Sequence, residues 1–266
     1  MLPIKKIYID SRYSVAGSTS SNFSIQLDKN YYFPQGSVFY VDSVVIPTSY
    51  YMVQNGRSEN FYFAIGNTSS SLTIQKVSLT EGNYKSDTLV AALIAKINAY
   101  LPGSVTGTFD TELNSISIQI VNAGISLYIP SDADLIKFHG ASMPLNTINP
   151  ILRNFKSQTS YTKTSPFVVD YLDLFPIRNL YIHSNIGNNK TIHVNGQCSI
   201  IKQIPINAPY NSLVVDHTLL GSDYIECGGQ SLSLLNFRLT NVFNEEIDLN
   251  GNHWSFNLLF AKVQPE

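Results

Sequence analysis

The last long segment of the chain alternates large apolar side chains with small or polar ones. Every second position from residue 254 carries one of the large groups: Trp254, Phe256, Leu258 and Phe260. A two-residue period places all four on one face of a β-strand. The segment 234–240 has the same period, and the connector 241–252 is polar and rich in turn-forming residues. We therefore expect two half-buried antiparallel strands that carry the single tryptophan into a core, with another sheet covering their aromatic face.

The same β-type pattern recurs along most of the chain. Outside residues 69–165 it predicts roughly eight strands, joined by long polar loops and with almost no helix, which suits a two-sheet antiparallel β-sandwich such as a jelly roll. The β-branched run 38–47 is typical of a central strand. Asp42 and Ser43, in the middle of that run, indicate a bulge or a change of face.

Residues 69–165 follow a different pattern. A strand at 72–79 precedes a helix in which Ser86 is the expected N-cap. The helix has its apolar residues at helical spacing, among them Leu89, Leu93 and Ile97. Three short strands follow at 106–110, 114–121 and 125–130, and the stretch 140–165 lacks periodicity and is expected to be loop.

These patterns together predict a mainly β protein with an insertion. We interpret residues 69–165 as an inserted small α/β subdomain of β-α-β-β-β type, in which the helix packs onto its own small sheet. Residues 1–68 and 166–266 are then the first and second parts of the jelly-roll domain.

The chain is weakly charged for its size. Charged residues make up 14% of its 266 residues, against a usual share of about 25%. Such a composition is common in β proteins and in proteins whose surfaces become buried against partners. The net charge is −2 and no run of Lys or Arg occurs, so we expect no specific nucleic-acid binding.

Membrane and disulfide signals are weak. No apolar run reaches the roughly 18 residues of a membrane helix, so we expect no transmembrane segment. The opening MLPIKK leads straight into a strand-like run, and we expect no secretion signal. Cys198 and Cys227, the two cysteines, have no CxxC spacing and are expected to be free thiols.

We find no catalytic residue, no cofactor-binding residue and no metal site that the sequence supports. His183 and His193 flank a turn and could approach a metal together with Asp170 or Asp173, although exposed strand histidines are the ordinary explanation. The loop residues Asn244, Glu245 and Asp248 do not have EF-hand spacing for Ca²⁺. Cys227 has no neighbouring base in the sequence that would activate it. We therefore expect that the protein is not an enzyme.

Three parts of the chain resemble a known family. The segments that carry the likeness are IYIDSR at 7–12 with NFSIQL at 22–27, VSLTEGNY at 77–84 leading into the helix 86–101, and FRLT at 237–240 with IDLNG at 247–251 and WSFNL at 254–258. In this order they resemble minor capsid (penton) proteins of the Polinton, adintovirus and virophage group. The stretch 140–170 contributes nothing to the likeness.

The resemblance implies a structural virion protein of jelly-roll type. It implies a homopentamer at the icosahedral fivefold vertices, beside the major capsid protein, in a virion that assembles inside the host cell. A host receptor or a glycan is a further partner to consider. The alternative is a receptor- or carbohydrate-binding β-sandwich head of a viral fibre or spike that uses loop tyrosines, since the chain has 16 tyrosines. A glycan-cleaving enzyme on a β-sandwich is the weakest hypothesis.

Overall fold

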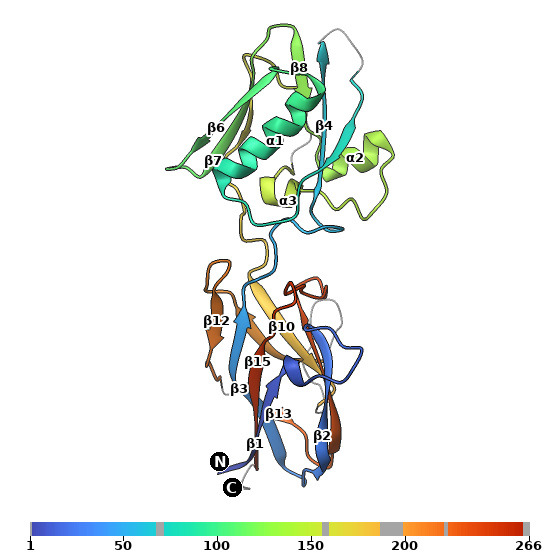
Figure 1. The fold of residues 1–266 in the computed structure, drawn as a ribbon, viewed down its shortest axis with the longest axis vertical. Coiled ribbons are helices and arrows are strands. Elements are labelled where there is room, and N and C mark those ends of the chain that lie inside the picture. The colour runs from blue at the N-terminus through green and yellow to red at the C-terminus, as the bar shows by residue number, and fades with distance from the viewer. Residues whose placement is uncertain (1, 68–71, 156–159, 187–198, 221–222, 263–266) are drawn as a thin grey trace. The chain divides into compact units, whose positions relative to one another are not determined.

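The computed structural model describes residues 2–67, 72–155, 160–186, 199–220 and 223–262, and the chain divides into two compact units (Figure 1). Unit 1 combines Met1–Tyr50 with Ile177–Glu266, and unit 2 is Tyr51–Pro176. One insertion therefore interrupts the chain of unit 1.

Unit 1 is a sandwich of two antiparallel sheets. The first sheet has the order β1 (Leu2–Asp10), β15 (Ser255–Lys262), β3 (Ser37–Pro47) and β12 (Leu213–Asp216), and β13 (Ile225–Glu226) also pairs with β3. The second has the order β11 (Ile200–Pro205), β10 (Asn179–Ser184), β14 (Ser231–Thr240) and β2 (Asn22–Tyr32). Strands from the two ends of the chain are neighbours in both sheets, which is the arrangement of a jelly roll. The predicted antiparallel jelly-roll sandwich is therefore confirmed.

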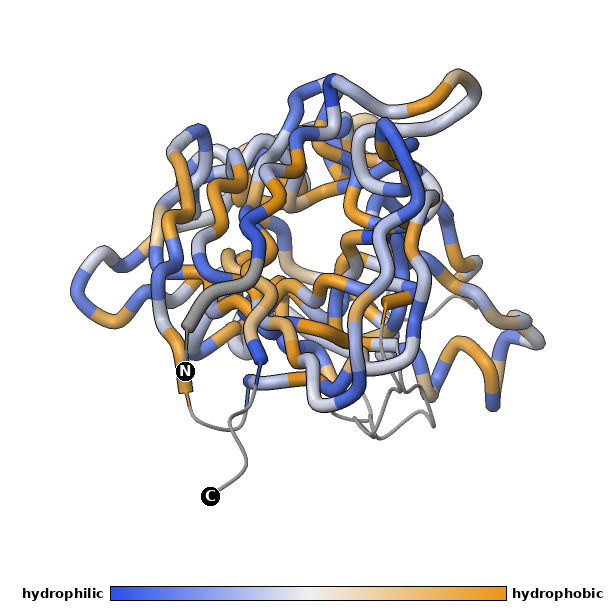
Figure 2. Tube along the Cα trace, turned by 90° about the horizontal axis from the view of Figure 1, so that it is seen from below, coloured by the Kyte–Doolittle hydropathy of each residue, from blue (hydrophilic) through white to orange (hydrophobic). Residues whose placement is uncertain are grey.

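The core of unit 1 lies between the two sheets and is aromatic. The rings of Phe237 on β14 and Phe256 on β15 meet edge to face with 4.9 Å between their centroids, a favourable geometry for an aromatic pair. The expected strand pair is therefore corrected, because β14 and β15 belong to opposite sheets and face each other. The connector between these strands was expected to be a polar loop, but two of its residues, Ile247 and Leu249, are fully buried. Hydrophobic and hydrophilic residues, orange and blue in Figure 2, are interspersed along the chain trace.

The bulge predicted in the middle of β3 is present. Asn257 of β15 lies opposite Ser43, and the next residue, Leu258, lies opposite Val41. Asp42 is therefore the extra residue, which bends the strand locally. The bulge lies opposite β15 and leaves Asp42 on the outer face of the sheet, where it meets Lys6 of β1.

The described residues of unit 2 form two three-stranded antiparallel sheets and three helices. One sheet has the order β5 (Gln75–Ser78), β4 (Asn60–Asn67) and β8 (Ile125–Tyr128); the other has the order β6 (Val105–Asp110), β7 (Ser115–Ile120) and β9 (Phe167–Val169). The helices are α1 (Ser86–Tyr100), α2 (Asp132–His139) and α3 (Asn149–Leu152). The stretch 140–165, expected to be loop, thus contains one short helix, whose four residues are too few for a periodic pattern.

Helix α1 packs against β6 as its apolar spacing predicts, with Leu89, Leu93 and Ile97 fully buried. Its start differs from the prediction by one residue. Lys85 is the N-cap, and its backbone N–H donates to Thr88 Oγ1 at 2.9 Å. Ser86 is instead the first helical residue, because its hydroxyl donates to Asn114 Oδ1 at 3.1 Å outside the helix.

The bounds of the insertion differ from those expected at 69 and 165. β4 was expected in the jelly roll, but it pairs with β5 and β8 and so belongs to unit 2. At the other end, β9 lies beyond the expected bound at 165 but pairs with β7, so it also belongs to unit 2. Sequence periodicity shows that a strand exists but not which partner it takes. Among the described residues, no helix is long and apolar enough to cross a membrane.

Candidate assembly surfaces

The outer face of the first sheet of unit 1 carries exposed apolar residues along β12. Val214 and Asp216 point inward and are buried, so Leu213 and Val215 point outward, where they are 56% and 45% exposed. The register places Leu213 opposite Pro47 and Val215 opposite Val45 on the same face. We call these four residues, Val45, Pro47, Leu213 and Val215, the β12 patch.

Exposed aromatic residues lie at the opposite edge of the same sheet. Tyr8 on β1 is 74% exposed, and Tyr13 in the short 3-10 helix η1 (Ser11–Tyr13) is 78% exposed. We call Tyr8 and Tyr13 the β1 patch. In the sheet order, β15 lies between β1 and β3, the nearer strand of the β12 patch, and β12 itself is about 14 Å from β1 at the usual spacing of strands.

The charged groups near this outer face are paired with one another. Lys6 Nζ lies 2.6 Å from Asp42 Oδ2, and Arg12 Nη2 lies 2.5 Å from Asp10 Oδ2. The hydrogen bonds from Arg12 hold the pKa of Asp10 below its ordinary value. The charges of these two acids and two bases therefore neutralise each other.

A hollow of about 250 Å³ adjoins the β12 patch on this face. Its lining residues are Asp10, Arg12, Val45, Pro47, Leu213, His253, Trp254 and Ser255. His253 is exposed and its Nδ1 lies 3.0 Å from Ser11 Oγ, so the side chain at the rim is held in place.

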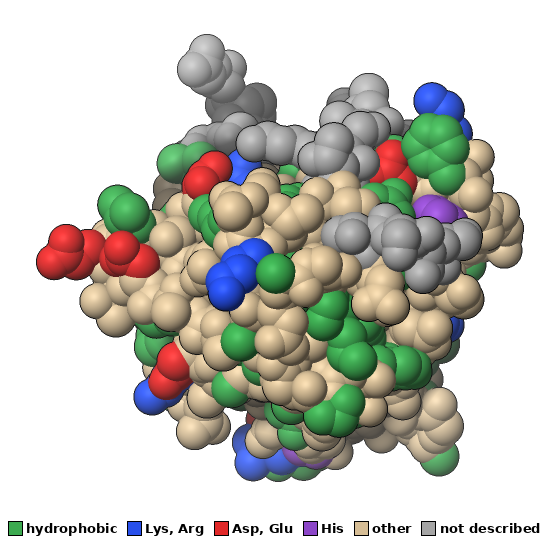
Figure 3. Space-filling model, turned by 90° about the horizontal axis from the view of Figure 1, so that it is seen from above, with side chains coloured by type: hydrophobic (Ala, Val, Ile, Leu, Met, Phe, Trp, Pro, Cys, Tyr) green, Lys and Arg blue, Asp and Glu red, His purple; other side chains and the backbone are tan. Residues whose placement is uncertain are grey.

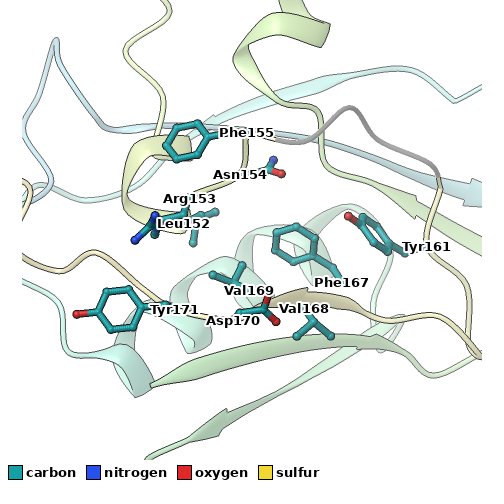
Figure 4. Close-up of a pocket in the computed structure, with 10 residues that line it drawn as sticks. All are labelled: Leu152, Arg153, Asn154, Phe155, Tyr161, Phe167, Val168, Val169, Asp170 and Tyr171. Carbon is teal, nitrogen blue, oxygen red and sulfur yellow. The ribbon is translucent and has the colours of Figure 1, made fainter. Parts of the chain in front are cut away.

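Unit 2 has a larger groove, of about 470 Å³, along strand β9 (Figure 4). One wall is the end of α3 and the residues after it, and the other is β9 and the residues after it. The lining residues are Leu152, Arg153, Asn154, Phe155, Tyr161, Phe167, Val168, Val169, Asp170 and Tyr171. Four aromatic rings and two opposite charges therefore border one open groove, which no sequence pattern had indicated.

Catalytic or metal-binding groups do not gather in the part of the chain that the structure describes. No group of three His, Cys, Asp or Glu side chains there could hold a metal. His183 is buried, with Nδ1 2.9 Å from Ser199 Oγ and Nε2 2.9 Å from Thr240 Oγ1. Both ring nitrogens thus have hydroxyl partners, which favours a structural role. His193 and Cys198 lie outside the described residues.

The remaining candidate groups are also engaged in structural contacts. The acidic loop residues each accept a hydrogen bond of 2.6–2.8 Å: Glu245 from Asn241, Glu246 from Asn22 and Asp248 from Asn250. Their carboxylates therefore act separately on neighbouring amides. Cys227 is a free, buried thiol, and burial raises its pKa to about 12, so the nucleophilic thiolate is disfavoured.

Comparison with known proteins gives matches by structure but none by sequence. The chain matches no protein-family model and no curated protein sequence. Its structure is similar to that of the mavirus penton protein, with a TM-score of 0.55 and 12% sequence identity, over 97% of this chain and 100% of the penton chain. This chain has the fold of the mavirus penton protein. A structure of the Sputnik virophage from cryo-EM also matches, with a TM-score of 0.49, 12% identity and coverage of 97% and 98%.

The likeness to the mavirus penton protein includes both units, because the alignment covers nearly the whole of each chain. The resemblance inferred from three sequence segments is therefore confirmed at the level of the fold. Those segments lie in and beside β1 and β2, around β5 and α1, and in β14, β15 and the connector between them. Because only 12% of the aligned residues are identical, the two proteins resemble each other in topology more than in individual residues.

Proposed function

We propose that this chain is a penton-type minor capsid protein, which forms a homopentamer at the fivefold vertices of an icosahedral virion beside the major capsid protein. The observation that carries the proposal is the shared fold over the full length of the mavirus penton protein. A match over both units supports a shared role better than a match of the common jelly roll alone, since the jelly roll serves many functions.

The surfaces of unit 1 suit a ring of identical copies. A cyclic pentamer needs a heterologous contact, in which one patch of each copy meets a different patch of the next. The β12 patch and the β1 patch lie at opposite edges of one sheet, so each copy can contact a neighbour on either side. In this arrangement Leu213 and Val215 of one copy contact Tyr8 and Tyr13 of the next.

The low charge of the surface supports burial against neighbours. In the face of the protein shown in Figure 3, red and blue side chains are few and scattered among uncharged ones. Charged residues are depleted in the centre of protein interfaces, where tyrosine is enriched. A capsid subunit contacts other subunits on several sides, and a chain with 14% charged residues has surfaces of this type.

The mass of the purified full-length chain tests the proposal. Five copies of the 29.6-kDa chain have a mass of 148 kDa, and native mass spectrometry should detect this species. A mass near 89 kDa, that of three copies, would instead support a trimeric fibre or spike head. A chain that stays monomeric at every concentration up to about 100 μM, well above the Kd of specific assemblies, would contradict the proposal.

The composition of purified virions provides the second test. A penton is present at five copies for each fivefold vertex, so its ratio to the major capsid protein is fixed by the geometry of the particle. Quantitative mass spectrometry with labelled peptides measures this ratio. A variable ratio, or absence of the chain from the particle, would exclude a vertex role. The described residues offer no observation that favours the fibre head or a glycan-cleaving enzyme over this proposal.

A further inference from the structure

The groove in unit 2 runs beside an open sheet edge. β7 is the central strand of its sheet, with β6 on one side and β9 on the other, so β9 has a strand partner on one side among the described residues. An open edge presents backbone N–H and C=O groups that can pair with another strand. The first question is therefore which backbone groups of β9 face away from β7.

The hydrogen bonds of the neighbouring strands answer this question. Val121 N–H donates to Ser104 O at 2.9 Å, from the end of β7 toward β6. In contrast, the backbone N–H and C=O of Val105 bond the side chain of Asn98, away from β7. Because successive residues of a strand point to opposite sides, residues 116 and 118 of β7 direct their backbone groups toward β9.

The register then fixes the orientation of β9. Ile118 lies opposite Phe167 and Ile116 lies opposite Val169, so Phe167 and Val169 use their backbone groups to bond β7. Val168, between them, directs its N–H and C=O to the other side, and the N–H of Asp170 points the same way. These are the groups that border the groove, and Val168 and Asp170 are among its lining residues.

The opposite wall of the groove is held in place. The side chain of Asn154 donates to the carbonyls of Ile129 and Pro130, at 3.3 and 3.2 Å. At one end, Asp173 N–H donates to Ile151 O at 2.9 Å and joins the two walls. At the other end, the rings of Tyr161 and Phe167 pack with 5.2 Å between centroids. Contacts within unit 2 thus hold both walls of the groove in place without a partner.

The exposure of the lining residues favours a polypeptide over a small molecule. Phe155 is 66% exposed and Val168 is 50% exposed, so two apolar side chains of the groove are accessible to a partner. Small-molecule sites enclose most of the ligand surface, whereas half or more of the surface of these two side chains is exposed. The open edge of β9 and the apolar walls together match the mode in which an extended peptide adds a strand to a sheet.

We propose that the groove binds an extended peptide segment of a second protein as an added strand along β9. The segment bonds Val168 through its backbone and places an apolar side chain at every second position against Phe155 and Phe167. An acidic group of the segment faces Arg153, and a basic group faces Asp170, because these two side chains border opposite walls. The inference does not depend on the proposed pentamer, since the groove lies entirely within unit 2.

The experiment uses a phage-displayed library of random twelve-residue peptides, selected on the full-length chain and counter-selected on its Val168→Pro variant. Proline removes the N–H that faces the groove and leaves the bonds between β9 and β7 intact. We expect enriched peptides to have apolar residues at alternate positions. The matched control is Val168→Thr, which keeps both the N–H and the β-branched shape.

Fluorescence anisotropy with the enriched peptides then measures Kd. We expect Val168→Pro to weaken binding about tenfold, the value of one backbone hydrogen bond, while Val168→Thr binds within about threefold of the original chain. Replacement of the wall by Phe155→Ser should also weaken binding. N-methylation at alternate peptide positions should abolish binding at those that face β9 and leave the others unchanged, which tests the proposal even if Val168→Pro does not fold.

Three results would overturn the inference. The first is failure of the library to yield peptides that prefer the original chain, and the second is binding that neither Val168→Pro nor N-methylation changes. The third is saturable binding of a glycan on an array at this groove, with no peptide binding. The mass of the Val168→Pro chain separates this test from the proposed function, because loss of peptide binding should leave a pentamer intact.

Discussion

Lys202 of β11 and Asp216 of β12 form an ion pair between the two sheets of the sandwich, with 3.4 Å between Nζ and Oδ2. Both side chains are buried, with 5% and 8% of their surface exposed. Asp223 Oδ2 lies 3.2 Å from the same Nζ, which also donates to the carbonyl of Thr218. A buried ammonium group needs such acceptors, because its desolvation is costly.

Replacing Lys202 by Met should lower the free energy of unfolding by about 3–5 kcal/mol, because Asp216 is then buried without a cation. Urea denaturation followed by tryptophan fluorescence measures this change, since Trp254 lies in the same core. The double variant Lys202→Met with Asp216→Leu should recover much of the loss, because apolar residues often replace a buried ion pair without cost. Equal stability of the single variant and the original chain would contradict the assigned role of the pair.

This ion pair shows where prediction from sequence stops. Lys202 and Asp216 are ordinary charged residues in two strand-like segments, and no local period distinguishes them from exposed ones. Their contact arises because β11 and β12 belong to opposite sheets. The same holds for Phe237 and Phe256, whose strands were expected to be neighbours in one sheet. Period-two patterns identified the strands and their apolar faces, while the jelly-roll topology decides which faces meet.

Gly107 should not tolerate a side chain, because α1 crosses β6 at this position. A Cβ on Gly107 would lie 2.7 Å from Val90 Cγ1 and closer still to Ile94 Cδ1. Gly107→Ala should therefore lower the stability of the chain by about 1–3 kcal/mol through overpacking. Thermal unfolding measures the effect, with the exposed neighbour change Thr106→Ala as the control.

A second variant tests this mechanism at Gly107. Ile94→Val removes the Cδ1 methyl group that would contact the new Cβ most closely. In the Ile94→Val background, Gly107→Ala should therefore cost less than it does alone. Equal costs in both backgrounds would show that steric contact with Ile94 is not the cause.

Cys227 should resist alkylation in the native protein. Burial raises the pKa of its thiol from the ordinary 9.0 to about 12, so little thiolate exists at pH 8.5. Iodoacetamide labelling of a chain that carries Cys198→Ser, followed by mass spectrometry, should be at least about 100-fold slower in the folded than in the unfolded protein. Equal rates would show that the thiol is accessible.

The same shift predicts a pH dependence of stability. The unfolded chain loses the thiol proton at a lower pH than the folded chain, because the folded pKa is raised. The contribution of Cys227 is therefore at full value below about pH 9 and is lost as the pH rises toward 12. Urea denaturation between pH 7 and 11 should show a steeper decline for the original chain than for Cys227→Ala. Parallel curves for the two proteins would contradict this prediction.

The groove in unit 2 could not be predicted from the sequence, because its walls show no periodic pattern. Its walls come from the stretch 140–165 and from β9, which has three residues. Helix α3 within that stretch has four residues and β9 has three, which are too few to show a period of 3.6 or 2, so local pattern gave no signal there. By contrast, the fifteen-residue helix α1 and the eight-residue strand β15 were predictable, because each repeats its period several times.

The contact proposed between the β12 patch and the β1 patch gives a prediction about assembly. Val215→Lys places a charge in the centre of an apolar contact, so native mass spectrometry should show the 29.6-kDa monomer in place of the 148-kDa pentamer. The control Leu113→Lys changes an exposed apolar residue in unit 2, a leucine that is 66% exposed, and should leave the pentamer unchanged.

The partner of the β12 patch is tested by a compensating change. Tyr8→Glu alone should also disrupt the pentamer, because it places an acid on the other side of the same contact. A chain with both Val215→Lys and Tyr8→Glu should regain the pentamer, since each contact then pairs a lysine with a glutamate, and about 300 mM salt should weaken it again by screening that pair. If the double variant stays monomeric while both single variants fold, the two patches do not meet. A pentamer that forms normally with Val215→Lys alone would place the contact on another face, because a lysine buried in an apolar interface without a partner is too costly to tolerate.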